Sequence, residues 1–427
     1  MHKIERLLQT LAPKGVEFKT LEEVFEIRNG YTPSKNNPEF WKNGTIPWFR
    51  MEDIRENGRI LKDSIQHITP KALKGKKLFP KNSIIISTTA TIGEHALLIV
   101  DSLANQQFTF LSKKANCDIA LDMKFFFYQC FLLGEWCKNN TNVSGFASVD
   151  MSAFKKYKFP IPPLEIQQEI VKILDAFTEL NTELNTELNA RKKQYQYYQN
   201  MLLDFNDINQ SHKDAKERLA QKPYPKRLKT LLHTLAPKGV GFRKLGEVCE
   251  ILDNRRIPIA KNKRNPGIYP YYGANGIQDY IDSYIFDGDF VLVGEDGSVI
   301  NKDNTPVVNW ASGKIWVNNH AHVLQTKNEL KLKFLYFYLQ TIDVSYCVAG
   351  TPPKINQENL KKITIPIPPL EIQQEIVKIL DQFSLLTTDL LAGIPAEIKA
   401  RKKQYEYYRE KLLTFKPLTP HKEVKKC

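Results

Sequence analysis

Two long stretches of the chain contain short apolar runs that are separated by polar, glycine-containing loops. In the first stretch, IIIS at 84–87 leads through such a loop into HALLIV at 95–100, and in the second, FVLVG at 290–294 leads into the loop EDGS. Short apolar runs with these boundaries predict buried β-strands. Each stretch continues into an aromatic-rich run with helical spacing, at 124–136 and at 333–340. Both stretches are therefore expected to adopt one mixed α/β fold.

A different pattern, apolar residues three or four positions apart, follows each stretch. The segment PIPPLEIQQEIVKILD at 160–175 returns letter for letter at 366–381. Its Pro-Pro pair predicts a helix start, because proline cannot continue a helix from upstream but fits its first turn. In the first copy the apolar stripe continues for about forty residues, which predicts a helix of roughly 60 Å that packs along a partner helix. Packing positions are expected at Ile170, Leu174, Phe177, Leu180, Leu184, Leu188, Ile376, Leu380 and Phe383.

The first of these helices contains the tetrad TELN written three times, at 178–189. Four residues advance about 400° in an α-helix, so the tetrad leucines keep facing a partner only if the helix unwinds locally. The second helix carries Gly393 and Pro395 and is expected to kink near 393–395. Two such helices, one at the end of each half, would lie antiparallel and act as a spacer.

The two halves of the chain are thus an internal sequence repeat. ARKKQYQYY at 190–198 returns as ARKKQYEYY at 400–408, and LLQTLAPKG at 7–15 returns as LLHTLAPKG at 231–239. We expect an α+β protein in which two similar globular domains are joined by two long antiparallel helices, with an internal pseudo-two-fold repeat. The expected parts are a first globular domain (1–158), a first helical region (159–205), a linker (206–226), a second globular domain (227–364), a second helical region (365–416) and a basic tail (417–427).

Composition narrows the possible functions. Lys and Arg outnumber Asp and Glu by 61 to 47, which favours a polyanionic partner, with nucleic acid first and an acidic membrane surface second; a generally basic proteome is the alternative explanation. The 6 cysteines include no C-x-x-C pair, so neither a zinc ribbon nor a disulfide framework is expected. No run approaches the roughly 18 apolar residues of a membrane span, and the N-terminus lacks a signal-peptide core, so a cytoplasmic location is expected.

Catalytic motifs are missing from the sequence. It has no G-x-x-x-x-G-K-[ST] loop and no G-x-G-x-x-G turn, and its three Pro-Pro pairs continue as PPL, PPK and PPL without the aromatic residue of amino-methyltransferases. The EIK sequence at Glu397 resembles the tail of a nuclease motif but falls in a predicted helix. His320 and His322 could hold a metal, although hydrogen-bonding or DNA-facing histidines are favoured because no further ligand is near. Glu295 and Asp296 form either an ordinary turn or an acidic loop that accepts from a cytosine amino group.

Three classes of protein fit part of this picture. A DNA-reading adaptor explains the duplicated layout, the basic charge, the spacer helices and the missing catalytic motifs together. A nuclease or methyltransferase acting alone explains only the charge. A coiled-coil scaffold explains the helices, but not two diverged α/β domains with loops rich in Asn, Arg and Tyr.

The adaptor interpretation agrees with a family resemblance. PIPPLEIQQEIVKILD, the ARKKQYEYY tail, and the loops TPSKNNPEFWKNGTIPWF (32–49) and YPYYGANGIQDYIDSYIFDGDFVLVGEDG (269–297) closely resemble the specificity subunit of type I restriction-modification systems. The resemblance covers essentially the whole chain. It implies that each globular domain, which the family calls a target recognition domain, reads one half of a bipartite DNA site.

The same resemblance implies the partners and cofactors. The paired helices would set the gap between the half-sites and dock two methyltransferase subunits, and restriction subunits would join where they are present. The chain itself would be no enzyme and would hold no cofactor or metal, because S-adenosylmethionine, ATP and magnesium are expected on the partner subunits. Since one tetrad adds about 6 Å of helix, we hypothesise that the number of tetrads sets the length of the gap.

Candidate DNA contacts are the Arg, Lys, Asn, Gln, Ser and Thr side chains of the loops, together with a few aromatic residues and one histidine beside them, because polar and basic side chains read base edges and bind phosphates. In the first domain they are Thr32, Ser34, Lys35, Asn36, Asn37, Arg50, Thr88, Thr89, Thr91, Asn105, Gln106, Gln107, Ser144, Phe146 and Ser148. In the second domain they are Asn254, Arg255, Arg256, Lys261, Lys263, Arg264, Tyr271, Asn275, Asn319, His320, Thr351 and Lys354.

Overall fold

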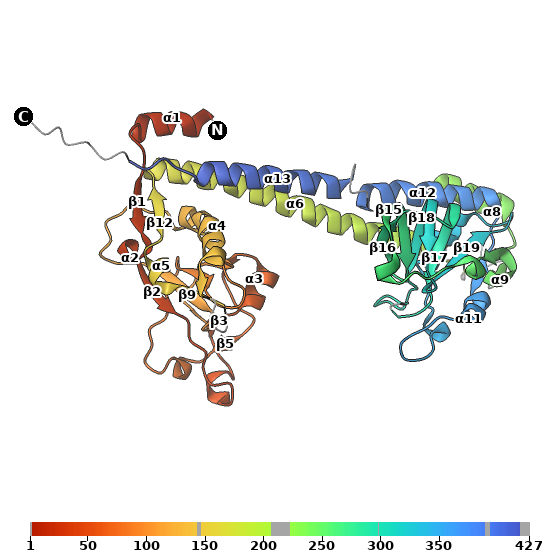
Figure 1. Cartoon of the computed structure of the whole chain (residues 1–427), viewed down its shortest axis with the longest axis horizontal. Coiled ribbons are helices and arrows are strands. Elements are labelled where there is room, and N and C mark those ends of the chain that lie inside the picture. The colour runs from red at the N-terminus through yellow and green to blue at the C-terminus, as the bar shows by residue number, and fades with distance from the viewer. Residues whose placement is uncertain (1, 143–146, 206–222, 298, 389–392, 419–427) are drawn as a thin grey trace, which may run out of the picture. The chain divides into compact units, whose positions relative to one another are not determined.

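The computed structural model describes residues 2–142, 147–205, 223–297, 299–388 and 393–418. The chain divides into two compact units (Figure 1): unit 1 comprises Met1–Glu183 and Lys399–Cys427, and unit 2 comprises Leu184–Ile398. Helix α6 (Leu164–Leu203) begins in unit 1 and ends in unit 2, whereas α13 (Ile394–Leu413) begins in unit 2 and ends in unit 1. Each unit therefore combines segments from both halves of the chain, whereas the parts expected from the repeats are contiguous in sequence.

Unit 1 is built around a five-stranded sheet in the order β2-β9-β6-β7-β4. Its central strand β6 is buried on both faces, because Ile84 and Ile86 enter one core while Ile85 enters another. This burial explains why the strand reads as a continuous apolar run. The first core lies between the sheet, α4 and the start of α6, and the second lies against a three-stranded sheet, β5-β3-β8.

The strands of unit 1 are β1 (Glu17–Thr20), β2 (Phe25–Asn29), β3 (Ile46–Phe49), β4 (Ile60–Leu61), β5 (His67–Ile68), β6 (Ile84–Ser87), β7 (His95–Leu98), β8 (Leu103–Ala104), β9 (Phe108–Lys113), β10 (Thr141–Asn142), β11 (Ser148–Val149) and β12 (Lys158–Ile161). Its α-helices, besides parts of α6 and α13, are α1 (His2–Leu11), α2 (Leu21–Val24), α3 (Met51–Asn57), α4 (Met123–Asn139) and α5 (Met151–Lys155), and its 3-10 turns are η1 (Pro38–Phe40) and η2 (Pro70–Leu73).

Unit 2 repeats this construction with a six-stranded sheet in the order β14-β19-β17-β18-β15-β16. Strand β17 is again buried on both faces, with Val291 and Val293 in one core and Leu292 in the other. The strands are β13 (Phe242–Lys244), β14 (Cys249–Ile251), β15 (Pro266–Gly273), β16 (Gly276–Ile281), β17 (Phe286–Gly294), β18 (Val308–Val317), β19 (Ala321–Thr326) and β20 (Thr364–Pro366). The α-helices are α8 (Lys226–Leu235), α9 (Leu245–Val248), α10 (Leu332–Leu339), α11 (Gln357–Lys362) and α12 (Leu370–Thr388), and the 3-10 turns are η4 (Asp253–Arg255), η5 (Lys261–Lys263) and η6 (Ser345–Cys347).

Each unit contains a pair of packed helices that combines the two copies of the repeat. In unit 1 the ring of Phe177 on α6 contacts Tyr405 and Tyr408 on α13, and in unit 2 the ring of Tyr198 on α6 contacts Phe383 on α12. Helices α6 and α12 begin immediately after their Pro-Pro pairs, as predicted. The expected mixed α/β fold with an internal repeat is confirmed.

The predicted kink falls only partly within the described residues. Helix α12 ends at Thr388, and α13 begins at Ile394 with Pro395 in its first turn; residues 389–392 lie outside the description. Among the described helices, none is both long and apolar enough to cross a membrane.

Candidate nucleic-acid interface

Three segments of unit 1 meet beyond one end of strand β6, and we call them the unit 1 crest: residues 88–94, 105–107 and 147–149. The amide of Thr88 donates to the carbonyl of Gln107 at 3.1 Å, and the amide of Val149 donates to the carbonyl of Thr88 at 2.9 Å. Thr89 and Ser148 form an isolated β-bridge. These backbone bonds join segments that are far apart in sequence into one surface.

Two glycine contacts bring the unit 1 crest close to its supports. A Cβ on Gly93 would lie 2.5 Å from the carbonyl oxygen of Gly134 on α4, and a Cβ on Gly134 would lie equally close to the carbonyl of Gly93. A Cβ on Gly30 would lie 2.1 Å from the carbonyl oxygen of Asn105. Side chains at these positions would push the crest away from the helix and from the end of β2.

Unit 2 has an equivalent surface, the unit 2 crest, formed by residues 295–297, 318–320 and 351–355. The amide of Glu295 donates to the carbonyl of His320 at 2.8 Å, and the amide of Ile355 donates to the carbonyl of Glu295 at 2.9 Å. Asp296 and Lys354 form the isolated β-bridge that corresponds to Thr89 and Ser148. The same backbone frame therefore holds different side chains in the two units.

The pairing of the strands below the two crests matches individual residues of unit 1 with individual residues of unit 2. Thr109 pairs with Ile86 of β6 and with Asn29 of β2. His322 pairs with Val293 of β17. On β14, Ile251 pairs with Leu324, and Asp253 lies two positions after Ile251. In both units an asparagine side chain, Asn105 or Asn318, accepts from the amide two residues later, at 3.1 and 2.8 Å.

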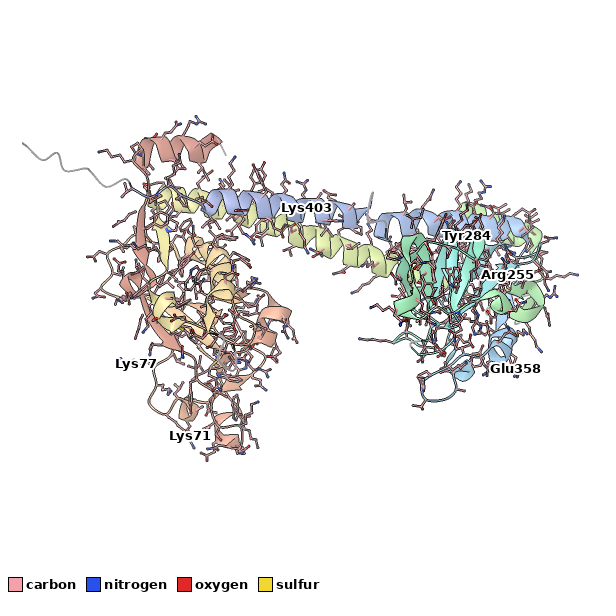
Figure 2. The ribbon with its side chains drawn as sticks, viewed as in Figure 1. Lys71, Lys77, Arg255, Tyr284, Glu358 and Lys403 are labelled. Atoms are coloured by element: carbon pink, nitrogen blue, oxygen red, sulfur yellow. The ribbon has the colours of Figure 1, made fainter. Side chains whose placement is uncertain are left out.

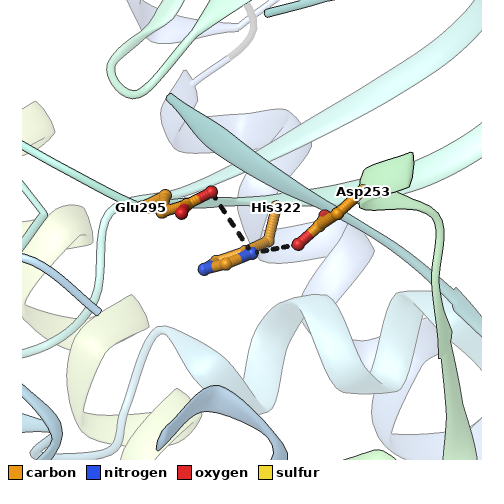
Figure 3. A group of neighbouring side chains, drawn as sticks. All are labelled: Asp253, Glu295 and His322. Carbon is orange, nitrogen blue, oxygen red and sulfur yellow. Dashed lines mark hydrogen bonds and ion pairs between the residues drawn. The ribbon is translucent and has the colours of Figure 1, made fainter. Parts of the chain in front are cut away.

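A triad of polar side chains lies beneath each crest at matching positions. In unit 1 the triad is uncharged: the hydroxyls of Thr88 and Thr109 lie 3.0 Å apart, and the Thr109 hydroxyl donates to Asn29 Oδ1 at 3.0 Å. In unit 2 it consists of ionisable residues (Figure 3): His322 Nδ1 lies 2.6 Å from Asp253 Oδ2 and 3.7 Å from Glu295 Oε2. The crests thus share their frame but differ in the chemistry under it.

The Asp253 carboxyl is stabilised in its ionised form. Burial alone would raise its pKa, but the hydrogen bond with His322, the charges of His322 and Arg256, and the amide of Val323 outweigh burial and lower the pKa. Asp253 therefore supplies a fixed negative charge to which its neighbours are paired.

The largest group of predicted contacts in unit 1 lies at its crest. Thr88, Thr89, Thr91, Asn105, Gln106, Gln107 and Ser148 belong to it, with Gln106 exposed and Thr88 buried. A second group, Thr32, Ser34, Lys35, Asn36 and Asn37, lies on the loop between β2 and η1, and Arg50 precedes α3. Ser144 and Phe146 lie outside the described residues.

The predicted contacts of unit 2 divide into exposed and enclosed side chains. Exposed are Asn254, Arg255, Lys261, Lys263, Asn275, Asn319, His320, Thr351 and Lys354. Figure 2 shows Arg255 at the surface of the unit. Arg264 is enclosed, since its guanidinium lies 4.0 Å above the ring of the buried Tyr271 and pairs with Asp279 at 3.4 Å.

Basic side chains that were not predicted as contacts lie beside the crest of unit 1 and on a separate lysine-rich run. A cavity of about 640 Å³ is lined by crest residues and by Arg55, Arg59 and Lys138. The run KALKGKK at 71–77 adds exposed lysines on the part of unit 1 away from α13, where Figure 2 shows Lys71 and Lys77. The closely spaced lysines of this run are the sequence feature that could have identified it as a candidate contact.

Comparisons with known proteins agree with this architecture. The sequence profile of the family described as the type I restriction modification DNA specificity domain matches residues 13–194 and again 237–400. The chain is 41% identical over 406 residues to the type I restriction enzyme EcoprrI specificity subunit of Escherichia coli, covering 91% of this chain and 93% of that protein. It is 45% identical over 179 residues to a putative type I restriction enzyme specificity subunit of Haemophilus influenzae, covering 41% of this chain and 46% of that protein.

Solved structures show the same fold. The crystal structure of the type I restriction-modification system S subunit from M. genitalium matches with a TM-score of 0.54 at 15% identity, covering 93% of this chain and 96% of that one. A structure described as concerning complex assembly and conformational transition of the type I restriction-modification system matches with a TM-score of 0.56 at 16% identity, covering 94% and 98%. The family profile matches most of the chain, in two copies that fall on the two halves of the repeat. The chain therefore belongs to the type I restriction modification DNA specificity family.

Proposed function

We propose that the chain is the DNA-reading subunit of a type I restriction-modification complex, in which each crest reads one half of a bipartite site. The observation that carries this proposal is the pair of crests, which stand on the same backbone frame in both units but present different side chains. Thr89 and Ser148 occupy positions that Asp296 and Lys354 occupy in the other unit. A protein that reads two unlike half-sites needs this combination, because base contacts specify sequence while the frame only positions them.

The same proposal assigns the helices to spacing and docking. Exposed apolar residues recur at equivalent positions: Leu164 is 38% exposed and Leu370 is 42% exposed, while Tyr197 and Tyr407 are 57% and 59% exposed. Unit 1 contains Leu164 and Tyr407, and unit 2 contains Leu370 and Tyr197. A matching set of exposed apolar residues in each unit suits two identical partners, and we assign these residues to the docking of two methyltransferase subunits. Restriction subunits, where the cell makes them, would join this core.

Catalysis and its cofactors belong to the partners in this proposal. S-adenosylmethionine would be held by the methyltransferase subunits, and ATP and magnesium by the restriction subunits. The chain contributes sequence reading, the gap between half-sites and the attachment of its partners. It would work in the cytoplasm, together with the DNA that it reads.

The test is methylation of DNA by the purified chain with and without methyltransferase subunits, in the presence of S-adenosylmethionine and magnesium. We expect no methylation by the chain alone and methylation at one gapped, asymmetric site once the subunits are added. Methylation by the chain alone, or methylation without a gapped site in the complex, would contradict the proposal.

Docking is tested separately by native mass spectrometry of the complex. Leu164→Glu and Leu370→Glu are each expected to remove one methyltransferase subunit, and the double variant both. Leu385→Glu is the matched control, because Leu385 is 63% exposed and the first copy already has a glutamate, Glu179, at that position. Loss of subunits from the control, or none from the double variant, would exclude this surface.

A further inference from the structure

Arg256, a predicted DNA contact, has its guanidinium turned into unit 2, where the side chain is 11% exposed. Its Nε donates to the carbonyl of Asp253 at 3.1 Å, and its Nη1 donates to Glu295 Oε2 at 2.6 Å and to the carbonyl of Ala321 at 2.8 Å. One planar side chain thus joins Asp253 in η4, Glu295 in the first segment of the unit 2 crest, and Ala321, which directly follows the second segment.

The groups around Arg256 extend these links to the third crest segment. Glu295 Oε1 pairs with Lys354 at 3.2 Å. His322 Nε2 lies 2.8 Å from the carbonyl oxygen of Ile355, and Gln357 donates to Asp253 at 3.2 Å. Arg256 Nη1 also lies 3.4 Å from the carbonyl oxygen of Asn319 in the second crest segment. Every segment of the unit 2 crest therefore has a bond to Arg256 or to a side chain that Arg256 contacts.

A metal ion is a poorer explanation of this cluster. The possible ligand atoms of Asp253, Glu295 and His322 lie within 4.8 Å of one another. However, Arg256 already pairs with both carboxylates, at 3.4 Å for Asp253 and 2.6 Å for Glu295, and both ring nitrogens of His322 face oxygen acceptors. The cluster thus contains its own cation, and a second one beside it would be repelled.

The arrangement also bears on Glu295 and Asp296, for which the sequence left open an ordinary turn or an acidic loop that accepts from a cytosine amino group. Both carboxylate oxygens of Glu295 are engaged, by Arg256 and Lys354, and the side chain is 13% exposed. Asp296 pairs with His320. Glu295 therefore faces inward and serves the frame of the crest.

We propose that Arg256 is a positioning residue that determines specificity at one half-site, by locking the three segments of the unit 2 crest through Asp253, Glu295 and His322. The proposal rests on the proposed function of the crests. In the described part of unit 1 the corresponding triad of Asn29, Thr88 and Thr109 is neutral, and the crest is seated on α4 through Gly93 and Gly134. Loosening the lock should therefore affect one half-site and spare the other.

The decisive comparison is Arg256→Lys against Arg255→Lys. Both variants keep the net charge, so long-range attraction to DNA is unchanged. Arg256→Lys loses the planar fork that contacts three segments. Arg255 is exposed; its guanidinium donates to the carbonyl of Ile285 at 3.2 Å and lies over the ring of Phe286. Arg255→Lys therefore leaves the lock intact.

The first measurement needs no DNA. Hydrogen exchange of the full chain should show faster exchange of the Glu295 and Ile355 amides in Arg256→Lys, because their bonds hold the crest segments together. The Thr88 and Val149 amides of unit 1 should be unchanged, as should all four in Arg255→Lys. Unaltered exchange at Glu295 and Ile355 in Arg256→Lys would overturn the lock, whatever the chain does with DNA.

The second measurement uses the complex with methyltransferase subunits and a duplex library randomised in one half-site at a time. Arg256→Lys should lower discrimination at one half-site by about tenfold, roughly what one well-placed base contact supplies, and leave the other unchanged. If the Glu295 and Ile355 amides exchanged faster while discrimination at both half-sites stayed at the wild-type level, the specificity role would be overturned. Loss at both half-sites would also overturn it, since the effect would then be global. If the wild-type complex showed no gapped site, the proposed function would fail, while the exchange result would still decide the lock.

Discussion

The ring of Phe177 stacks on the ring of Tyr408, with centroids 5.7 Å apart and planes 28° from parallel, although the two residues belong to opposite copies of the repeat. The same pairing recurs in unit 2, where Tyr198 and Phe383 stack at 5.2 Å and 25°. Each unit is therefore completed by the helix end of the other copy. Leu412 and Leu413 of the second copy lie in a core of unit 1, and Leu202 and Leu203 of the first copy lie in a core of unit 2.

This exchange predicts a measurable coupling between the two copies. Phe177→Ala and Tyr408→Ala should each destabilise unit 1 by about 1–3 kcal/mol, since both rings are half-buried. A double-mutant cycle should return a coupling of about 0.5–1.5 kcal/mol, typical of an aromatic pair. Hydrogen exchange of unit 1 amides is the measurement. Tyr407→Ala is the control, because Tyr407 is exposed, and coupling of similar size between Phe177 and Tyr407 would contradict the assignment.

A second prediction concerns the paired glutamines of the repeated segment. Gln167 is fully buried: its Oε1 accepts from the amide of Asp122 at 2.8 Å, and its Nε2 donates to the carbonyls of Ala120 and Pro162 at 2.9 and 2.6 Å. Gln373 makes the same set of bonds in unit 2.

Gln167→Ala should cost about 3 kcal/mol, because it leaves buried backbone groups without partners. The adjacent Gln168 is exposed, and Gln168→Ala should be almost neutral. Urea unfolding of the two variants gives the comparison. Equal stability of the two would show that the bonds contribute nothing.

The crests show how much of the site was accessible from sequence. Gln106, Asn319 and His320 were predictable because polar residues beside apolar strands mark loops at a sheet end. The enclosure of Arg256 was not, since its partner Glu295 is 39 residues away. Thr109 was also missed, because one polar residue in a short strand resembles ordinary alternation. His322 was singled out from the sequence, but its pairing with Asp253 and Glu295 was not.

The sequence predicted that the two helices pair antiparallel, but not that the end of each helix completes a core in the opposite unit. The segment at 160–175 is identical to that at 366–381, and the two tails differ at one position within ARKKQYQYY. Identical surfaces pack equally well on either copy, so no pattern of residues decides which tail completes which unit. Helix starts, in contrast, depend on the local Pro-Pro pair and were predicted correctly for α6 and α12.

A third prediction concerns pH. His95 is buried on β7 with its ring edge against Phe127 and Phe131. Burial first, and then the nearby charge of Arg59, lowers its pKa from 6.5 to about 3. The unfolded chain binds a proton at His95 more readily than the folded one, so this contribution to stability is complete above pH 6.5 and is lost as the pH falls toward 3.

Unit 1 should accordingly lose about 3 kcal/mol of stability from this residue between pH 7 and pH 4. His95→Gln, which cannot titrate, should flatten that part of the profile. His233→Gln is the control, since His233 is exposed, and it should leave the slope unchanged. Urea unfolding at several pH values, followed through unit 1 amides, provides the measurement, and an unchanged slope in His95→Gln would refute the assignment.

The last prediction concerns the tetrads. Helix α6 is continuous from Leu164 to Leu203 and contains all three TELN tetrads, whose leucines Leu180, Leu184 and Leu188 are half-buried while Glu179, Glu183 and Glu187 are exposed. Adding or removing one tetrad changes the helix by about 6 Å, a little under two base-pair steps of roughly 3.4 Å. The complex should then methylate the same two half-sites with a different gap.

The control for this prediction changes the composition of the tetrads and keeps their length. Replacing Glu179, Glu183 and Glu187 together by Gln should preserve the gap, because the replaced carboxylates are exposed. Methylation mapping of both variants distinguishes the explanations. If the tetrad deletion kept the parental gap, the helix would not set the spacing; if the Gln variant changed it, charge and not length would be responsible.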